Sequence, residues 1–282
     1  METKRPTYLS DPVWMETPWK HAQKTPWDKI FDVLTGTPEL FRRGQDIERL
    51  DLKSQLREAV EMINECWRID STLQQLCDKL ESGSPGPLYW PELSKERLPV
   101  DDSDLGKVFP VAFQFFNLST AATLLTLWGV QTMLWHAMWQ LYRLILETVH
   151  HTNITDKTGS ETSPPSSTVT APSERESITG KIKHVNTSNI DGSLLPPLGF
   201  RADFAEPARN ICQSAEYCLQ EETLDTGPLI LAAPLSIVVQ ILREYPQYSR
   251  EVAWASAVFQ KVAQRSLRLL NYEASLVAKA PS

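Results

Sequence analysis

The feature that most constrains this chain is the segment 108–142, which contains no Asp, Glu, Lys or Arg. An uncharged segment of this length is either a membrane span, which needs about 20 mostly apolar residues, or a helix buried on nearly all sides in a protein core. We favour the buried helix because unpaired polar groups are costly in lipid, and such groups recur at Gln114, Asn117, Thr126, Gln131 and His136. A membrane anchor remains the alternative interpretation.

The sequence predicts further helices packed around this central one. Pro110 and Asn117 interrupt the uncharged run, so we expect the central helix at 119–149. Thr25 is a suitable cap for the first helix, and Gly36 is expected to end it. Apolar residues recur at helical spacing in six other segments, namely 26–36, 37–44, 46–80, 207–221, 229–243 and 249–271. No strand pattern is evident. We therefore predict an all-α multi-helix bundle around a central buried helix.

The composition changes abruptly after residue 151. Thr, Ser, Pro, Gly and charged residues dominate the segment 152–200, which is typical of a disordered linker or insertion. The later helices have apolar faces that need a partner. We therefore expect the insertion to divide one helical domain into an N-terminal part, 26–151, and C-terminal helices, 201–275.

The first 25 residues form a separate Trp- and Pro-rich segment. Its prolines fix φ and restrain the residues before them, so we predict an extended strap. Trp14 and Trp19 are the candidate contacts to a partner protein, although they could also hold the strap against the helices. A proline-rich ligand segment is a weaker alternative, because no PxxP repeat is present.

The sequence suggests no metal or cofactor site. The four cysteines, Cys66, Cys77, Cys212 and Cys218, include no Cys-x-x-Cys pair. The last two are six residues apart, which places them on different sides of a helix. The acidic cluster 101–104 is predicted to be a solvated turn, and His136 a hydrogen-bonded core histidine. We expect no cofactor and no metal.

No catalytic motif is recognisable in the sequence. There is no nucleophile–base pair, phosphate-binding loop, GxSxG elbow or HExxH helix. We therefore expect no catalytic residues and do not expect an enzyme. An all-α enzyme or a small-molecule-binding protein of a metabolic gene cluster is the alternative.

The net charge and the composition of the first residues indicate which partners and which cellular location to expect. The chain carries 28 Lys and Arg against 35 Asp and Glu, a net charge of −7 without a basic block. Because Lys and Arg supply most of the affinity for phosphates, we expect no sequence-specific DNA binding by this chain alone. The first residues lack the apolar segment of a signal peptide, so we expect an intracellular protein with reduced thiols, not a secreted one.

Several short motifs follow one another in a specific order along the chain. They are FPVAFQF at 109–115, the segments 118–122 and 127–128, ICQSAEYC at 211–218, the Gly-Pro-Leu and Ala-Pro-Leu pair within 227–235, and Glu-x-x-Trp at 251–254. Together they resemble the fungal-specific transcription factor domain, the C-terminal regulatory domain of fungal zinc-cluster transcription factors. The early Trp-Pro segment fits the same pattern.

The resemblance implies a regulator that lacks the DNA-binding zinc cluster of such factors. In that family a zinc cluster held by six cysteines precedes the domain and binds DNA, whereas this chain has four scattered cysteines. The resemblance therefore implies the regulatory half alone, in the nucleus or cytoplasm, with other transcription regulators or a small effector as partners. Control of a fungal secondary-metabolic gene cluster is the expected role, and a truncated gene product is the alternative.

Overall fold

The structure is a computed structural model that describes residues 11–102, 105–158 and 195–277, with 149–158 and 265–277 as backbone only. Helices make up 75% of the described residues, and a small two-stranded sheet is the remaining regular structure within those ranges. The predicted all-α class is therefore confirmed. The predicted insertion 152–200 falls mainly on residues 159–194, which lie outside the described part of the chain.

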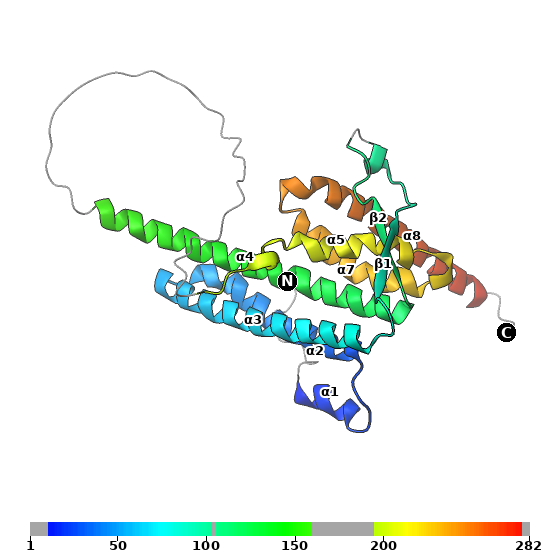
Figure 1. Ribbon diagram of the computed structural model, residues 1–282, viewed down its shortest axis with the longest axis horizontal. Helices are drawn as coiled ribbons and strands as arrows, with labels where there is room; N and C mark the ends of the chain where they lie inside the picture. The colour runs from blue at the N-terminus through cyan, green and yellow to red at the C-terminus, as the bar shows by residue number, and fades with distance from the viewer. Residues whose placement is uncertain (1–10, 103–104, 159–194, 278–282) are drawn as a thin grey trace, which may run out of the picture.

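The predicted central helix is α4 (Leu118–Thr158), which crosses the middle of the molecule (Figure 1). It begins one residue before the predicted start and continues past the predicted end at 149, so residues 152–158 belong to this helix and not to the predicted insertion. It buries most of its circumference, including Leu125, Trp135 and Met138. The helices α2 (Pro26–Asp46) and α3 (Leu52–Gly83) pack along one side of it. The helices α5 (Ala205–Gln213) and α7 (Thr226–Leu242) pack along another. None of the helices in the described ranges has the combination of length and hydropathy that a membrane crossing requires.

One long helix replaces two predicted short ones at the N-terminal end. Thr25 caps α2 through a reciprocal pair of hydrogen bonds with Asp28, as its position in the sequence indicated. The predicted break at Gly36 is wrong, because α2 continues through Pro38 to Asp46. A proline within a helix leaves a carbonyl four residues earlier without its amide donor. Here the Thr37 hydroxyl donates to that carbonyl, on Leu34, at 2.8 Å.

The next helix starts later than predicted. A short 3-10 turn, Ile47–Arg49, separates α2 from α3, and the Asp51 side chain caps α3 by accepting from the Ser54 amide at 3.2 Å. The predicted range 46–80 therefore becomes Leu52–Gly83. The buried positions along α3 follow the predicted apolar stripe, with Ala59, Ile63, Cys66 and Leu73 fully enclosed.

The two-stranded sheet corrects the prediction that no strand would form. Strands β1 (Tyr89–Leu93) and β2 (Val111–Phe115) pair antiparallel, and β2 contacts α5 and the short helix α6 (Ala215–Cys218). Strand β1 was not predicted because it contains Pro91, which has no backbone N–H to donate to a neighbouring strand. Pro91 is accommodated because β1 is an edge strand. The backbone hydrogen bonds across the hairpin involve even-numbered residues such as Leu88 and Ser94, so the nitrogen of Pro91 points away from β2.

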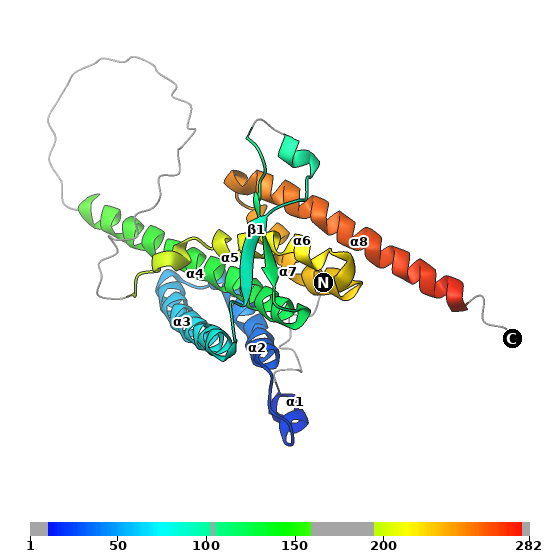
Figure 2. The ribbon, with the colours of Figure 1, turned by 45° about the vertical axis from the view of Figure 1, so that its right-hand side comes forward.

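The C-terminal helices include a break that the sequence pattern did not place. The predicted helix 207–221 is divided at Ser214 into α5 and α6, and Pro234 lies inside α7. Gly227 is required at the start of α7, because a Cβ there would lie 2.2 Å from the Cys218 carbonyl oxygen. The last helix, α8 (Ser249–Val277), packs on α7 and extends beyond the other helices (Figure 2).

The N-terminal segment is helical where it is described, so the predicted extended strap 1–25 is wrong for residues 12–19. The Asp11 side chain caps the short helix α1 (Pro12–Glu16), and a 3-10 turn, Thr17–Trp19, follows. Proline suits the first turn of such a helix because that turn needs no amide donor. Figure 1 shows α1 lying beyond the start of α2.

Candidate functional site

An open groove runs along α4 between α2 and α7. Its volume is about 620 Å³. The floor is formed by Met133, Ala137, Gln140 and Leu144 of α4, which recur at helical spacing. The walls come from residues 40–48, at the end of α2 and in the turn after it, and from residues 237–244, at the end of α7 and just after it. The complete lining is Leu40, Phe41, Gly44, Gln45, Ile47, Glu48, Met62, Met133, His136, Ala137, Gln140, Leu141, Arg143, Leu144, Glu147, Ile237, Gln240, Ile241 and Glu244.

The three helices that form the groove run in the same direction. Near its start, α2 places Trp27 so that the indole N–H donates to the Thr126 hydroxyl at 3.2 Å. Its last residues line the groove beside residues 133–147 of α4. Gly129 of α4 lies beside Pro234 of α7, and His136 beside Tyr245 just after α7. The C-terminal ends of α2 and α7, with their negative partial charges, therefore meet at one end of the groove.

Acidic side chains gather at this same end. Glu48, Glu147 and Glu244 line the groove and are exposed, and Arg143 is the only lysine or arginine among the described residues that line it. Arg143 forms an ion pair with Glu147 at 3.2 Å and lies over the Trp139 ring. The rim thus carries more negative than positive charge.

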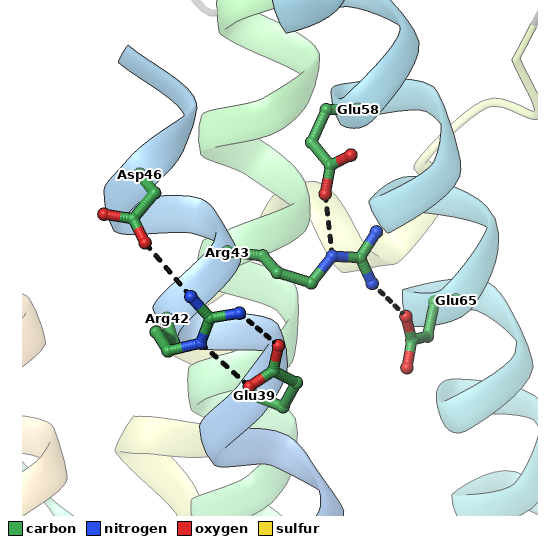
Figure 3. A network of polar contacts seen from close by, with 6 residues as sticks. All are labelled: Glu39, Arg42, Arg43, Asp46, Glu58 and Glu65. Carbon is green, nitrogen blue, oxygen red and sulfur yellow. Dashed lines mark hydrogen bonds and ion pairs between the residues drawn. The ribbon is translucent and has the colours of Figure 1, made fainter. Parts of the chain in front are cut away.

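The nearby arginines of α2 are paired elsewhere. Figure 3 shows Arg43 reaching across to α3, where its guanidinium contacts Glu58 at 2.7 Å and Glu65 at 2.8 Å. The hydrogen bond to Glu58 raises the pKa of Arg43. Arg42 contacts Glu39 at 2.5 Å and Asp46 at 3.2 Å on its own helix. Arg43 therefore links α2 to α3, Arg42 is paired within α2, and neither cation offsets the carboxylates of the groove.

An aromatic cluster borders the groove around His136. The His136 Nε2 lies 2.9 Å from the Tyr245 hydroxyl, and the imidazole ring also packs against Phe204. The prediction of a hydrogen-bonded core histidine is confirmed. Burial lowers the pKa of His136, and the charge of Glu244, 3.9 Å away, opposes this only in part. His136 is therefore neutral at pH 7 and adds no positive charge to the groove.

The opposite side of α4 is closed by a buried polar cluster. Asp70 of α3 is 2% exposed and accepts from the Trp135 indole N–H at 2.7 Å and from Arg201 Nε at 2.6 Å. The Arg201 guanidinium lies between the rings of Trp67 and Phe200. This arrangement fixes the chain where it returns at 195–201, so the predicted linker 152–200 is wrong for its last residues, of which Leu198 is fully buried.

The hydroxyl of Tyr142 also ties the returning chain to α3 and α4. The Tyr142 hydroxyl accepts from the Trp67 indole N–H at 3.0 Å and donates to the Pro196 carbonyl at 2.5 Å. Among the described residues, no buried side-chain nitrogen or oxygen lacks a hydrogen-bond partner. The polar groups on this side of α4 are therefore used internally and do not form a ligand site.

Two acidic residues singled out by the sequence organise loops. Asp101 was predicted to lie in a solvated turn, but it is 5% exposed and accepts from the amides of Leu98 and Val108, each at 2.9 Å. Glu216, within the ICQSAEYC motif, accepts from the amides of Lys95 and Glu96 at 3.0 and 2.6 Å. Both carboxylates serve as anchors for the loop that joins the two strands.

The cysteines are free thiols that are poorly suited to nucleophilic or metal chemistry. Burial raises the pKa of Cys66 to about 12, of Cys77 to about 11 and of Cys218 to about 12, and also raises that of Cys212. The reactive form of cysteine is the thiolate, which these environments disfavour. Within the described ranges, no three His, Cys, Asp or Glu side chains are grouped as metal ligands would be.

The predicted partner contacts lie apart from the groove. Trp14 is 55% exposed on α1, and Trp19 is half-buried in the turn that follows. Neither residue lines the groove. The groove was not predicted from the sequence, although one signal was present. Between the bulky residues of α4, the smaller or polar Ala137 and Gln140 lie on the same side as Met133 and Leu144.

Comparison with known proteins adds no family assignment. No protein-family model, curated protein or solved structure matches this chain.

Proposed function

We propose that this protein is a transcription-factor-like regulatory and interaction protein without a DNA-binding zinc cluster of its own. The observation that carries the proposal is the open groove between α2 and α7, which has a mostly apolar floor and a charged rim. Grooves of this kind are used to bind a segment of a partner protein. The ordered motifs that resemble the fungal-specific transcription factor domain support a regulatory role, with control of a fungal secondary-metabolic gene cluster as its biological context.

The proposed partner is another transcription regulator, such as a family member that carries a zinc cluster. The protein's net charge of −7 favours action through such a partner over direct contact with DNA phosphates. Trp14 and Trp19 are a second proposed contact region, because Trp14 is largely exposed and tryptophan is enriched at interaction hot spots. The proposed location is the nucleus, as the resemblance implies, or the cytoplasm.

A small effector is a second candidate for the groove. Its volume of about 620 Å³ falls in the range of about 300–1,000 Å³ that small-molecule sites occupy. In that case the protein would bind a metabolite and not chemically transform it. The exposed glutamates along the rim favour the protein partner, since small ligands are usually enclosed more completely.

The full chain provides the test. It is purified with an affinity tag and mixed with a full-length zinc-cluster regulator and a promoter fragment carrying that regulator's site. We expect the chain alone not to retard the fragment at physiological salt, and to join the complex when the regulator is present. Specific retardation by the chain alone, or failure to associate with any regulator encoded in the same gene cluster, would contradict the proposal. Replacing both Trp14 and Trp19 by Ala tests the second contact region in the same assay.

A further inference from the structure

We infer that the groove between α2 and α7 binds an amphipathic helix of a partner protein, and that the bound helix is basic. The inference rests on the proposed function, because it specifies the chemistry of the partner at the same site. Its support comes from the shape of the groove and from the balance of charge on its rim.

The shape of the groove fits a helix. The floor extends along α4 from Met133 to Leu144, which at about 1.5 Å per residue is roughly 16 Å, or three helical turns. An amphipathic helix of that length places three or four apolar side chains in one row, at i, i+3 or i+4 and i+7. Ala137 in the middle of the floor leaves room for one of these side chains between Met133 and Leu144.

The charge of the rim selects a basic helix. Glu48, Glu147 and Glu244 are exposed along the groove, and Arg143 is already paired with Glu147. The C-terminal ends of α2 and α7 add negative partial charge to this end of the groove. An acidic partner segment would be repelled by this end, whereas Lys and Arg on the exposed face of a bound helix would meet carboxylates.

Fluorescence anisotropy with the purified full chain tests this inference. The probe is a labelled synthetic amphipathic helix of about four turns, with leucines along one face and lysines along the other. One matched peptide has glutamate in place of every lysine, and another has the lysine sequence scrambled so that the leucine row is lost. We expect the lysine helix to bind at least about tenfold more tightly than either matched peptide, and to weaken with salt.

Variants locate the binding. Ala137→Trp fills the floor and should weaken the lysine helix about tenfold, whereas Ala253→Trp, at an exposed alanine of α8, should leave it unchanged. The double change Glu48→Lys and Glu244→Lys should shift the preference toward the glutamate helix. Glu222→Lys, at an exposed glutamate before α7, should not do so. Circular dichroism of each variant confirms that helicity is retained.

The possible results separate this inference from the proposed function. Equal binding of the lysine and glutamate helices would overturn the inference, because the rim would then not select a basic partner. Lysine-helix binding that Ala137→Trp does not reduce would also overturn it, because the attraction would then come from the general acidity of the protein and not from the groove. Tighter binding of the glutamate helix would overturn it as well. If the peptides behave as expected but no transcription regulator associates with the chain, the groove chemistry stands and the regulatory role fails.

Discussion

The two sides of α4 differ in whether their polar groups are paired within the protein or exposed. Trp135 and Tyr142, seven residues apart, face α3, and their polar atoms are bonded to Asp70, Trp67 and the Pro196 carbonyl. The floor of the groove lies about 180° around the same helix, at roughly 100° per residue. There the carboxylates of the rim remain exposed. A buried polar group stabilises a fold only when it is paired, whereas an exposed charge contributes little to stability and remains available to a partner.

The largest expected difference between the two sides concerns Asp70. Asp70→Asn removes the charge that balances Arg201, whose side chain is only 17% exposed, so the free energy of unfolding should fall by about 3 kcal/mol. Urea denaturation measures this loss. Glu147→Gln makes the same chemical change on the groove rim and should cost less than about 0.5 kcal/mol. Equal losses would show that the two sides do not differ in this way.

The hydroxyl of Tyr142 should have the next largest effect. Tyr142→Phe leaves the Trp67 indole N–H and the Pro196 carbonyl without their shared partner, so we expect a loss of about 1–2 kcal/mol in the free energy of unfolding. Tyr245→Phe, beside the groove, removes one bond to His136 near solvent and should cost less than about 1 kcal/mol. The comparison is weakened if Tyr245→Phe proves the more costly change in the same denaturation assay.

Acid should act on the groove side through His136. Burial lowers the pKa of His136 below its ordinary value of 6.5, so the unfolded chain binds a proton more readily than the folded one. The stability associated with this residue is complete above pH 6.5 and is lost as the pH falls through the lowered folded-state pKa. His136→Gln should flatten the dependence of the urea midpoint over this interval.

The smallest effect on stability is expected at the groove rim. Glu48→Gln should change the free energy of unfolding by less than about 0.5 kcal/mol, because the side chain is exposed. It should nevertheless weaken binding of a basic helix about twofold to threefold, through loss of one ionic contact. Thermal unfolding and peptide anisotropy measure the two quantities on one preparation. A large loss of stability with unchanged binding would assign Glu48 a structural role.

Local sequence signals predicted the elements that depend on local physics. The uncharged run gave the position of α4, and Thr25 gave the start of α2 through its cap. The missed features involve distant partners. The break expected at Gly36 does not occur, and the Thr37 hydroxyl bonds the Leu34 carbonyl that Pro38 leaves without a donor. The hairpin forms because β2 packs against helices that follow about 90 residues later. The Asp101 carboxylate was interpreted as solvated because its amide partners at 98 and 108 are brought together only by the folded loop.

The sequence by itself determined that the chain is helical, that its middle is buried and that His136 belongs to the core. These properties follow from spacing and polarity within a few turns of helix. Only the tertiary structure decided which polar groups are enclosed and which remain exposed. Asp70 is closed off by Arg201, 131 residues away along the chain, while Glu48, Glu147 and Glu244 are brought to one groove by three separate helices. The physical reason is that pairing across helices depends on their direction and packing, and a local pattern specifies neither.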